Sequence, residues 1–216
     1  YNVGILNTRG RLAEILTTLS EQGSEAVILQ GTRWGCQRPN GEEGEFHTQD
    51  VTGRTWRVWH WDAQQRDGAA GIAIAIPTTA TAQHRTTSGM FSTGRGAWVR
   101  LKSCTVDIPL VGLYIPPDRG GGGAQRSMQV LGHFESWLAR VPSRTSIVVG
   151  ADLNCRVGLI RRTDDVQVSV PGHRPPVGPR EPEKECPQGR AVRRLCGAWG
   201  LVLANTYFDL GGLDLS

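Results

Sequence analysis

The chain has 216 residues, which is enough to bury a hydrophobic core within one domain. Hydrophobic residues make up 38% of it and charged residues 20%, a balance that excludes a disordered chain. No apolar stretch approaches the roughly 18 residues that a membrane-spanning helix needs. We therefore expect a globular protein with no membrane partner, located inside the cell, in the nucleus or the cytoplasm.

The charge is mildly basic and carried almost entirely by arginine. The formal net charge is +4, and all but two of the 24 basic residues are Arg. Guanidinium groups suit phosphate recognition, so such a surface would attract a phosphate backbone, although a coding bias toward Arg explains the composition equally well. Five cysteines without CxxC spacing predict unpaired thiols.

The first third of the chain predicts a β-α-β unit. Residues 1–6 read as a strand, and Leu12, Ile15, Leu16 and Leu19 follow at helical spacing up to a stop at Gly23. Residues 26–30 then form a short buried strand. This opening favours the α/β class.

The remaining elements alternate between strands and helices. Residues 35–53 are polar and are predicted to be a surface loop. Strands are expected at 56–61, 71–76, 98–101, 106–114, a buried run at 147–149, and 201–205, and helices at 124–140 and 190–199. The Pro- and Arg-rich segment 156–188 contains VQVSV as its single strand-like run. Such a series predicts two sheets with helices outside them.

The most informative stretch is IVVGADLNC at 147–155, where Asp152 and Asn154 follow a buried strand. Residues two apart on an extended chain point the same way, so a carboxylate and a carboxamide would face one pocket. That pair suits hydrolysis of a phosphate ester. The alternative is a strand that ends in a turn whose Asp and Asn bond only backbone.

Three other predicted strand ends carry polar side chains. Asn7 follows the first strand, Gln30 ends the second, and Tyr114 ends VGLYIPP. Ligand sites in layered α/β proteins form where strand ends converge, which would bring these residues toward Asp152. Each of them alone has a structural explanation as well.

The ordered motifs resemble the endonuclease/exonuclease/phosphatase superfamily, the DNase I and exonuclease III-like proteins. The matching residues are NTRG at 7–10, VILQ at 27–30, GLYIPP at 112–117, VVGADLN at 148–154 and LVLANTYF at 201–208. The closest likeness is to the apurinic-type endonuclease domain of non-LTR retrotransposons and to craniofacial-development-protein-like sequences. The resemblance implies a four-layer α/β/β/α sandwich, with 1–216 as a single domain that is incomplete at its C-terminus.

The resemblance also implies a division of labour. A DNA phosphodiester would be hydrolysed with Mg²⁺, or with Mn²⁺, held by Asn7, Asp152 and Asn154. Tyr114 would contact the scissile phosphate, and Asp152 would orient or deprotonate the attacking water. Asn7 would contact the phosphate as well as the metal, and Asn154 would stabilise the charge growing on phosphorus.

Two departures from the family pattern predict a weak or inactive enzyme. The family places a metal-binding Glu directly after the Gln of the second strand, where this chain has Gly31. The family's closing Ser-Asp-His motif does not occur in the sequence. Glu42, Glu43 and Glu45 lie near Gly31 in sequence as conceivable substitutes.

Other functions of the same fold stay open. The chain could be a non-catalytic remnant that still binds nucleic acid, or a phosphatase or sphingomyelinase-like branch. The first residues, YNVGIL, already read as a strand, so we expect a piece of a longer protein, one that in the retrotransposon relatives is fused to a reverse transcriptase.

Overall fold

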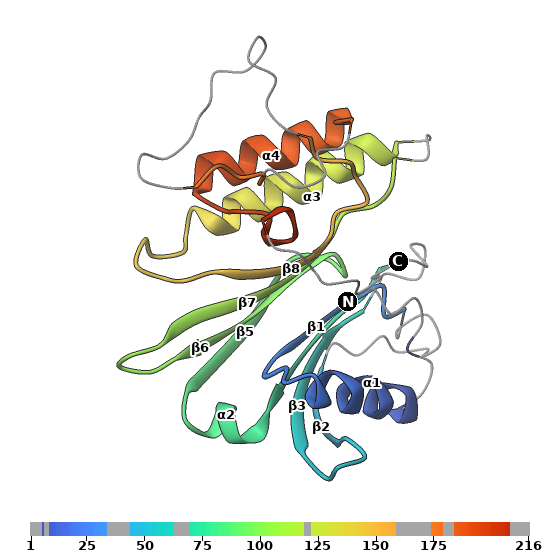
Figure 1. Ribbon diagram of the computed structural model, residues 1–216, viewed down its shortest axis with the longest axis vertical. Helices are drawn as coiled ribbons and strands as arrows, with labels where there is room; N and C mark the ends of the chain where they lie inside the picture. Colours follow the sequence, from blue (N-terminus) through green and yellow to red (C-terminus); the bar gives the residue numbers. More distant parts are fainter. Residues whose placement is uncertain are drawn as a thin grey trace. The chain divides into compact units, whose positions relative to one another are not determined.

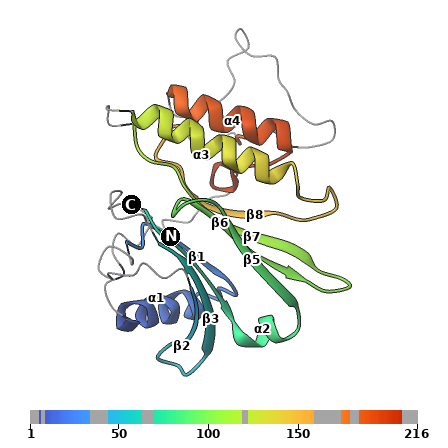
Figure 2. The same ribbon diagram turned by 180° about the vertical axis from the view of Figure 1, so that it is seen from behind.

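The structure is a computed structural model that describes two compact units. It describes residue 6 and residues 9–33, 44–62, 70–118, 122–158, 174–178 and 184–207. The first unit comprises Tyr1–Pro116 and Ala139–Leu153, and the second comprises Pro117–Leu138 and Asn154–Ser216. Figures 1 and 2 show the chain from opposite sides.

The first unit contains an antiparallel sheet covered by a helix. Its strand order is β1 (Val27–Gln30), β4 (Ile72–Pro77), β3 (Thr55–Trp61) and β2 (Gly44–Gln49). Helix α1 (Arg9–Glu21) lies along one face (Figure 1) and buries Leu12 and Leu16 in one core cluster with the strand residues Val27 and Leu29. The apolar stripe read from the sequence is therefore the face that α1 packs on the sheet.

The second sheet of this unit combines antiparallel and parallel pairing. Its order is β5 (Arg85–Ser92), β6 (Gly96–Lys102), β7 (Asp107–Tyr114) and β8 (Val148–Asp152), and only the β7–β8 pair is parallel. The short helix α2 (Thr78–Ala82) connects β4 to β5. The parallel pair matters for the site because both strands end at the same edge.

The two sheets pack face to face, and the two faces of β4 contribute to two different core clusters. Ile72, Ile74 and Ile76 belong to the cluster that also holds Ala97 and Val99 of β6. The alternate residues of β4, Ala73 and Ala75, belong to the α1 cluster. Because successive strand residues face opposite sides, the sequence IAIAIP supplies large side chains to one layer and small ones to the other.

Two glycines let the sheets approach closely. A Cβ atom on Gly112 would lie 2.4 Å from Cγ2 of Ile72, and one on Gly150 would lie 2.9 Å from Cβ of Ile28. Gly112 and Gly150 are register partners on β7 and β8. The stretch GADLN is therefore constrained at its glycine by packing, independently of any chemistry.

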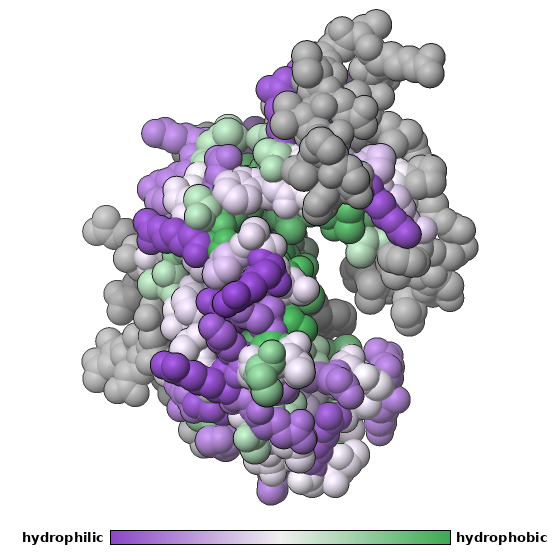
Figure 3. All heavy atoms as spheres, turned by 90° about the vertical axis from the view of Figure 1, so that its left-hand side faces the viewer, coloured by the Kyte–Doolittle hydropathy of each residue, from purple (hydrophilic) through white to green (hydrophobic). Residues whose placement is uncertain are grey.

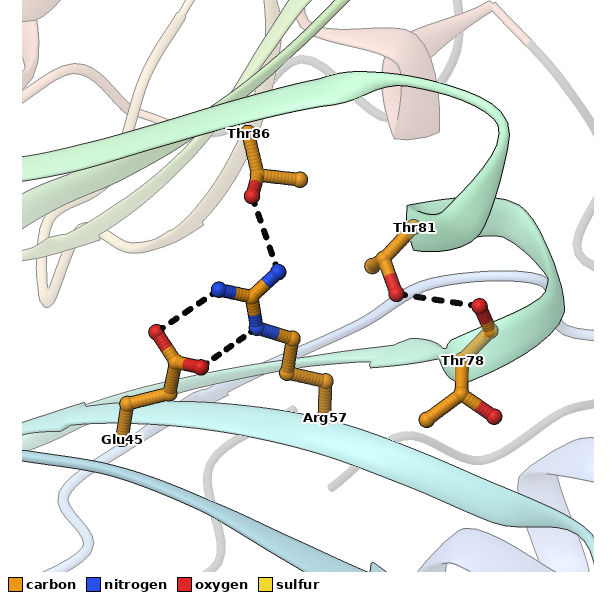
Figure 4. A network of polar contacts seen from close by, with 5 residues as sticks. All are labelled: Glu45, Arg57, Thr78, Thr81 and Thr86. Atoms are coloured by element: carbon orange, nitrogen blue, oxygen red, sulfur yellow. Dashed lines mark hydrogen bonds and ion pairs between the residues drawn. The ribbon is translucent and has the colours of Figure 1, made fainter.

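A polar network also joins the sheets (Figure 4). Arg57 of β3 binds Glu45 of β2 through two hydrogen bonds, Nε to Oε1 at 2.5 Å and Nη2 to Oε2 at 3.0 Å. Its Nη1 donates to the Thr86 hydroxyl of β5 at 2.9 Å. The hydrogen bonds from Arg57 hold the pKa of Glu45 below its ordinary value.

On the face seen in Figure 3, the described surface is mostly hydrophilic, with hydrophobic residues in small separate areas.

A buried carboxylate closes the β2–β3 hairpin. Asp50 is 4% exposed; its Oδ1 accepts from the Thr52 and Arg54 amides, both at 3.0 Å, and from the Thr52 hydroxyl at 2.7 Å. Its Oδ2 accepts from Nε1 of Trp56 at 3.0 Å. Burial opposes ionisation of this group, but the hydrogen bonds outweigh it and lower the pKa of Asp50.

Asp50→Asn should therefore lower the free energy of unfolding at neutral pH by about 2 kcal/mol. Both carboxylate oxygens of Asp50 accept hydrogen bonds, and the NH₂ group of asparagine would face at least one of these donors without being able to accept. A carboxylate with a depressed pKa stabilises the fold above its unfolded pKa, and this contribution is lost as the pH falls through the folded pKa. The stability difference between the wild type and Asp50→Asn should thus shrink below about pH 4. Urea unfolding across that range measures it; a difference that stays constant with pH would contradict the assignment.

The described residues of the second unit include two α-helices. Helices α3 (Gly123–Leu138) and α4 (Pro187–Trp199) lie side by side in both views (Figures 1 and 2). Cys186 caps α4 by accepting from the Gly189 amide, and Gly200 ends it with φ 66°. Arg193, 4% exposed, binds Glu185 through Nε and Nη2 at 2.7 and 3.1 Å.

Several predicted elements are corrected by the structure. Part of the predicted loop 35–53 is strand β2, which the polar sequence GEFHTQ concealed because it is an edge strand with little burial. Residues 201–205 are not a strand: the chain forms the 3₁₀ turn η2 (Ala204–Thr206), and the Leu203 amide donates to the Pro176 carbonyl at 2.8 Å. The run 147–149 is not fully buried, since Val148 of the edge strand β8 is 49% exposed. The predicted strand 1–6, apart from Leu6, and the run VQVSV lie outside the described residues.

Candidate active site

The ends of β7 and β8 bring together two of the residues predicted from sequence. Tyr114 and Asp152 are register partners, each the last residue of its strand. Paired residues of neighbouring strands point to the same face and lie about 4.8 Å apart. The Ile115 amide donates to the Asp152 carbonyl at 2.8 Å, which extends the pairing one residue further.

This pair sits at a partly enclosed position. Tyr114 is 6% exposed, whereas Asp152 is half-buried. A phenol and a carboxylate on adjacent strands provide one hydroxyl donor and one acceptor for a proton or a water molecule. The arrangement can therefore address a polar group such as a phosphodiester at this edge.

Gln30 ties the other sheet to the same edge. It ends β1, is 1% exposed, and its Nε2 donates to the Gly150 carbonyl of β8 at 2.8 Å. The sequence predicted Gln30 as a strand-end polar residue near the site. In the structure its side chain connects β1 to β8 at Gly150, two residues before Asp152.

Arg95 belongs to this edge and was missed by the sequence analysis. It immediately precedes β6, is 8% exposed, and its guanidinium carbon lies 5.5 Å from the centre of the Tyr114 ring. The Tyr114 amide donates to the Arg95 carbonyl at 2.8 Å, so backbone and side chain both connect the two residues. The signal was present in the sequence as an Arg between two Gly at a strand start, but an isolated Arg in an Arg-rich chain does not stand out.

The remaining predicted site residues have different placements. Asn7 lies outside the described residues. Asn154 is exposed, has the left-handed φ of 44°, and begins the second segment of the second unit. Because β8 ends at Asp152, the alternation argument that paired Asn154 with Asp152 extends beyond the strand, and the role of Asn154 stays a prediction.

The described donors do not fit a magnesium site. Gly31, at the position of the family's metal-binding Glu, has φ 68° and no side-chain oxygen. Glu45 is engaged by Arg57, and Glu42 and Glu43 lie outside the described residues. Among the residues that the structure describes, no three His, Cys, Asp or Glu side chains are grouped as a metal would require. Mg²⁺ is usually held by one or two protein carboxylates together with water and substrate phosphates. Of the predicted ligands, Asp152 is the carboxylate that the structure describes, so this set would hold the metal weakly.

Comparison with known proteins identifies the fold. No protein-family model and no curated protein matches the chain. The endonuclease domain of TRAS1, a telomere-specific non-LTR retrotransposon, superposes over 92% of this chain and 70% of its own, with TM-score 0.53 and 15% identity. An AP endonuclease from Archaeoglobus fulgidus has 17% identity and TM-score 0.45, covering 70% of this chain and 54% of its own. A humanized D. rerio TDP2 with 14 mutations has 12% identity and TM-score 0.40, covering 70% and 65%.

The chain is an α/β protein with the DNase I-like fold. The predicted fold class is thereby confirmed. None of the described helices has the length and hydrophobicity of a membrane span.

Proposed function

We propose that this domain binds the phosphodiester backbone of DNA at the Tyr114–Asp152 edge and cleaves it only weakly. The observation that carries the proposal is the register pairing of Tyr114 with Asp152 at the ends of two parallel strands. Gly31 accounts for the weak cleavage, because it removes the oxygen ligand at the end of β1. The fold shared with the TRAS1 endonuclease domain supports the choice of a nucleic-acid substrate.

In this proposal the residues act as follows. The Tyr114 hydroxyl contacts a non-bridging phosphate oxygen, and the Asp152 carboxylate orients the attacking water and accepts its proton. Asn154 donates to the oxygen on which charge develops, and Asn7 adds a further contact to the phosphate. General-base catalysis by a positioned carboxylate contributes typically 10²–10⁴-fold, which leaves slow but Asp-dependent cleavage.

Nicking of a supercoiled plasmid tests the proposal. The wild type should bind the plasmid and nick it slowly with Mg²⁺ or Mn²⁺, and Asp152→Ala should bind equally and reduce nicking to background. Rapid nicking by the wild type that Asp152→Ala abolishes would contradict the weak-enzyme part of the proposal. Absence of DNA binding at low salt would contradict all of it, since backbone binding strengthens as salt is removed.

Restoring a carboxylate at position 31 should carry a backbone cost. Gly31→Glu forces a side chain into a left-handed conformation, which costs about 1 kcal/mol; the melting temperature in EDTA should fall by a few degrees. Asn tolerates this conformation better, so Gly31→Asn is the matched control with a smaller fall. Adding Mn²⁺ should raise the melting temperature of Gly31→Glu more than that of the wild type. Equal shifts would show that position 31 does not face a metal.

A further inference from the structure

We infer that Arg95 supplies the positive charge of this site and holds the DNA phosphate without a metal ion. This inference rests on the proposed function and adds to it the residue that recognises the phosphate. No family motif in the sequence points to Arg95; its burial and its position over the Tyr114 ring do.

The chain holds Arg95 in place from several directions. Its amide donates to the Ser92 carbonyl at 3.0 Å, which closes the turn between β5 and β6, and its carbonyl accepts from Tyr114 at 2.8 Å. The preceding residue, Gly94, accepts at 2.8 Å from the Gly71 amide, just before β4 in the other sheet. The turn that carries Arg95 is thus attached to both sheets at the edge where β7 and β8 end.

A buried guanidinium has a restricted set of functions. It stays protonated in proteins, and its charge in a partly enclosed position acts more strongly than on the open surface. Its planar fork matches two oxygens of a phosphate, and stacking on an aromatic ring fixes its orientation in advance. A pre-oriented cation loses little side-chain entropy when a phosphate binds.

The location of this charge complements the missing ligand at Gly31. A metal ion at the site would neutralise the phosphate, but the described residues contain no group of three His, Cys, Asp or Glu side chains that could hold one, and Gly31 contributes no side-chain oxygen. Arg95 places a permanent cation next to Tyr114, the register partner of Asp152. Phosphate binding at this edge consequently does not depend on a divalent ion.

Binding of a fluorescein-labelled DNA duplex, followed by anisotropy in EDTA over a series of salt concentrations, tests the inference. The variants are Arg95→Gln, Arg95→Lys and the control Arg85→Gln. Arg85 starts β5 and is exposed, at the end of the same sheet remote from Tyr114, and its replacement changes the net charge equally. The thermal unfolding of each variant is measured in parallel, and Arg95→Lys serves as the charge-preserving form if Arg95→Gln does not fold.

The wild type should bind in EDTA, and Arg95→Gln should weaken binding about tenfold and lower the salt slope by about one. Arg95→Lys should keep the slope and lose part of the affinity, and Arg85→Gln should stay close to the wild type. Equal losses in Arg95→Gln and Arg85→Gln would overturn the inference, because binding would then be diffuse, and would leave the proposed function intact. Binding only with added Mg²⁺ would also overturn the inference alone, whereas no binding under either condition would overturn both.

Discussion

Gln30→Glu should make the stability of the fold steeply dependent on pH. The Gln30 amide donates to the Gly150 carbonyl at 2.8 Å from a position that is 1% exposed. A glutamate of the same shape can make that bond only when protonated, since an ionised carboxylate has no donor. Its pKa in the folded state is therefore expected to rise well above the unfolded value of about 4.3.

The sign follows from proton binding. A group whose folded pKa is raised binds its proton more tightly in the folded state, so stability falls as the pH rises from the unfolded toward the folded pKa. If the side chain stays protonated at pH 7, the cost is about 3.7 kcal/mol there and about 1 kcal/mol at pH 5, at 1.36 kcal/mol per pH unit. Urea unfolding at both pH values measures it.

Gln30→Leu is the control for this experiment. It removes the same hydrogen bond but cannot ionise, so it should lose a similar amount of stability at both pH values, about 1–3 kcal/mol for an orphaned carbonyl. A pH-independent loss for Gln30→Glu would show that the side chain escapes to solvent. The link between β1 and β8 would then be weaker than the geometry indicates.

Gly189→Ala should destabilise the second unit by about 2–3 kcal/mol, the upper part of the range for overpacking. A Cβ atom on Gly189 would lie 1.9 Å from the carbonyl oxygen of Arg156 and 2.7 Å from its carbon, and backbone atoms cannot move aside as a side chain would. The Cys186 amide donates to the same carbonyl at 3.1 Å, so the start of α4 is fixed against this segment.

Helix propensity alone predicts the opposite sign. Alanine favours a helix interior over glycine by roughly 1 kcal/mol, so without the clash the substitution would stabilise α4. Gly132→Ala on α3 is the matched control, because a Cβ there meets nothing within 4 Å, and it should raise the melting temperature. If both variants were stabilised, the close approach of α4 to Arg156 would be contradicted.

The sequence predicted the parts of the fold that depend on local pattern. Helix α1 and strand β4 each carry an uninterrupted apolar pattern, and both were found where periodicity placed them. Strand β2 was assigned to a loop, and strand β5 was not predicted. Both are edge strands, which bury few side chains and therefore have polar sequences. Residues 201–205 show the reverse: this apolar run leads into the 3₁₀ turn η2, and no strand of the described part of the chain pairs with it.

The candidate site was predictable only where residues lie at strand ends. Tyr114 and Asp152 follow apolar runs, so their convergence follows from parallel pairing of β7 with β8. Arg95 depends on a turn whose position is set by hydrogen bonds from Tyr114 to Arg95 and from Gly71 to Gly94, distant contacts that no local pattern encodes. The ion pair between Glu45 and Arg57 likewise depends on the register in which β2 pairs with β3.

Hydrogen exchange with and without a short DNA duplex tests most directly where the nucleic acid binds. The account predicts slower exchange on DNA binding in residues 92–96, 112–116 and 150–153, which together form the strand ends around Tyr114 and Asp152. Residues 85–88, at the remote end of the β5–β8 sheet, should exchange at an unchanged rate. Protection of that remote end with no change at 112–116 and 150–153 would contradict the assignment of this edge as the phosphodiester site.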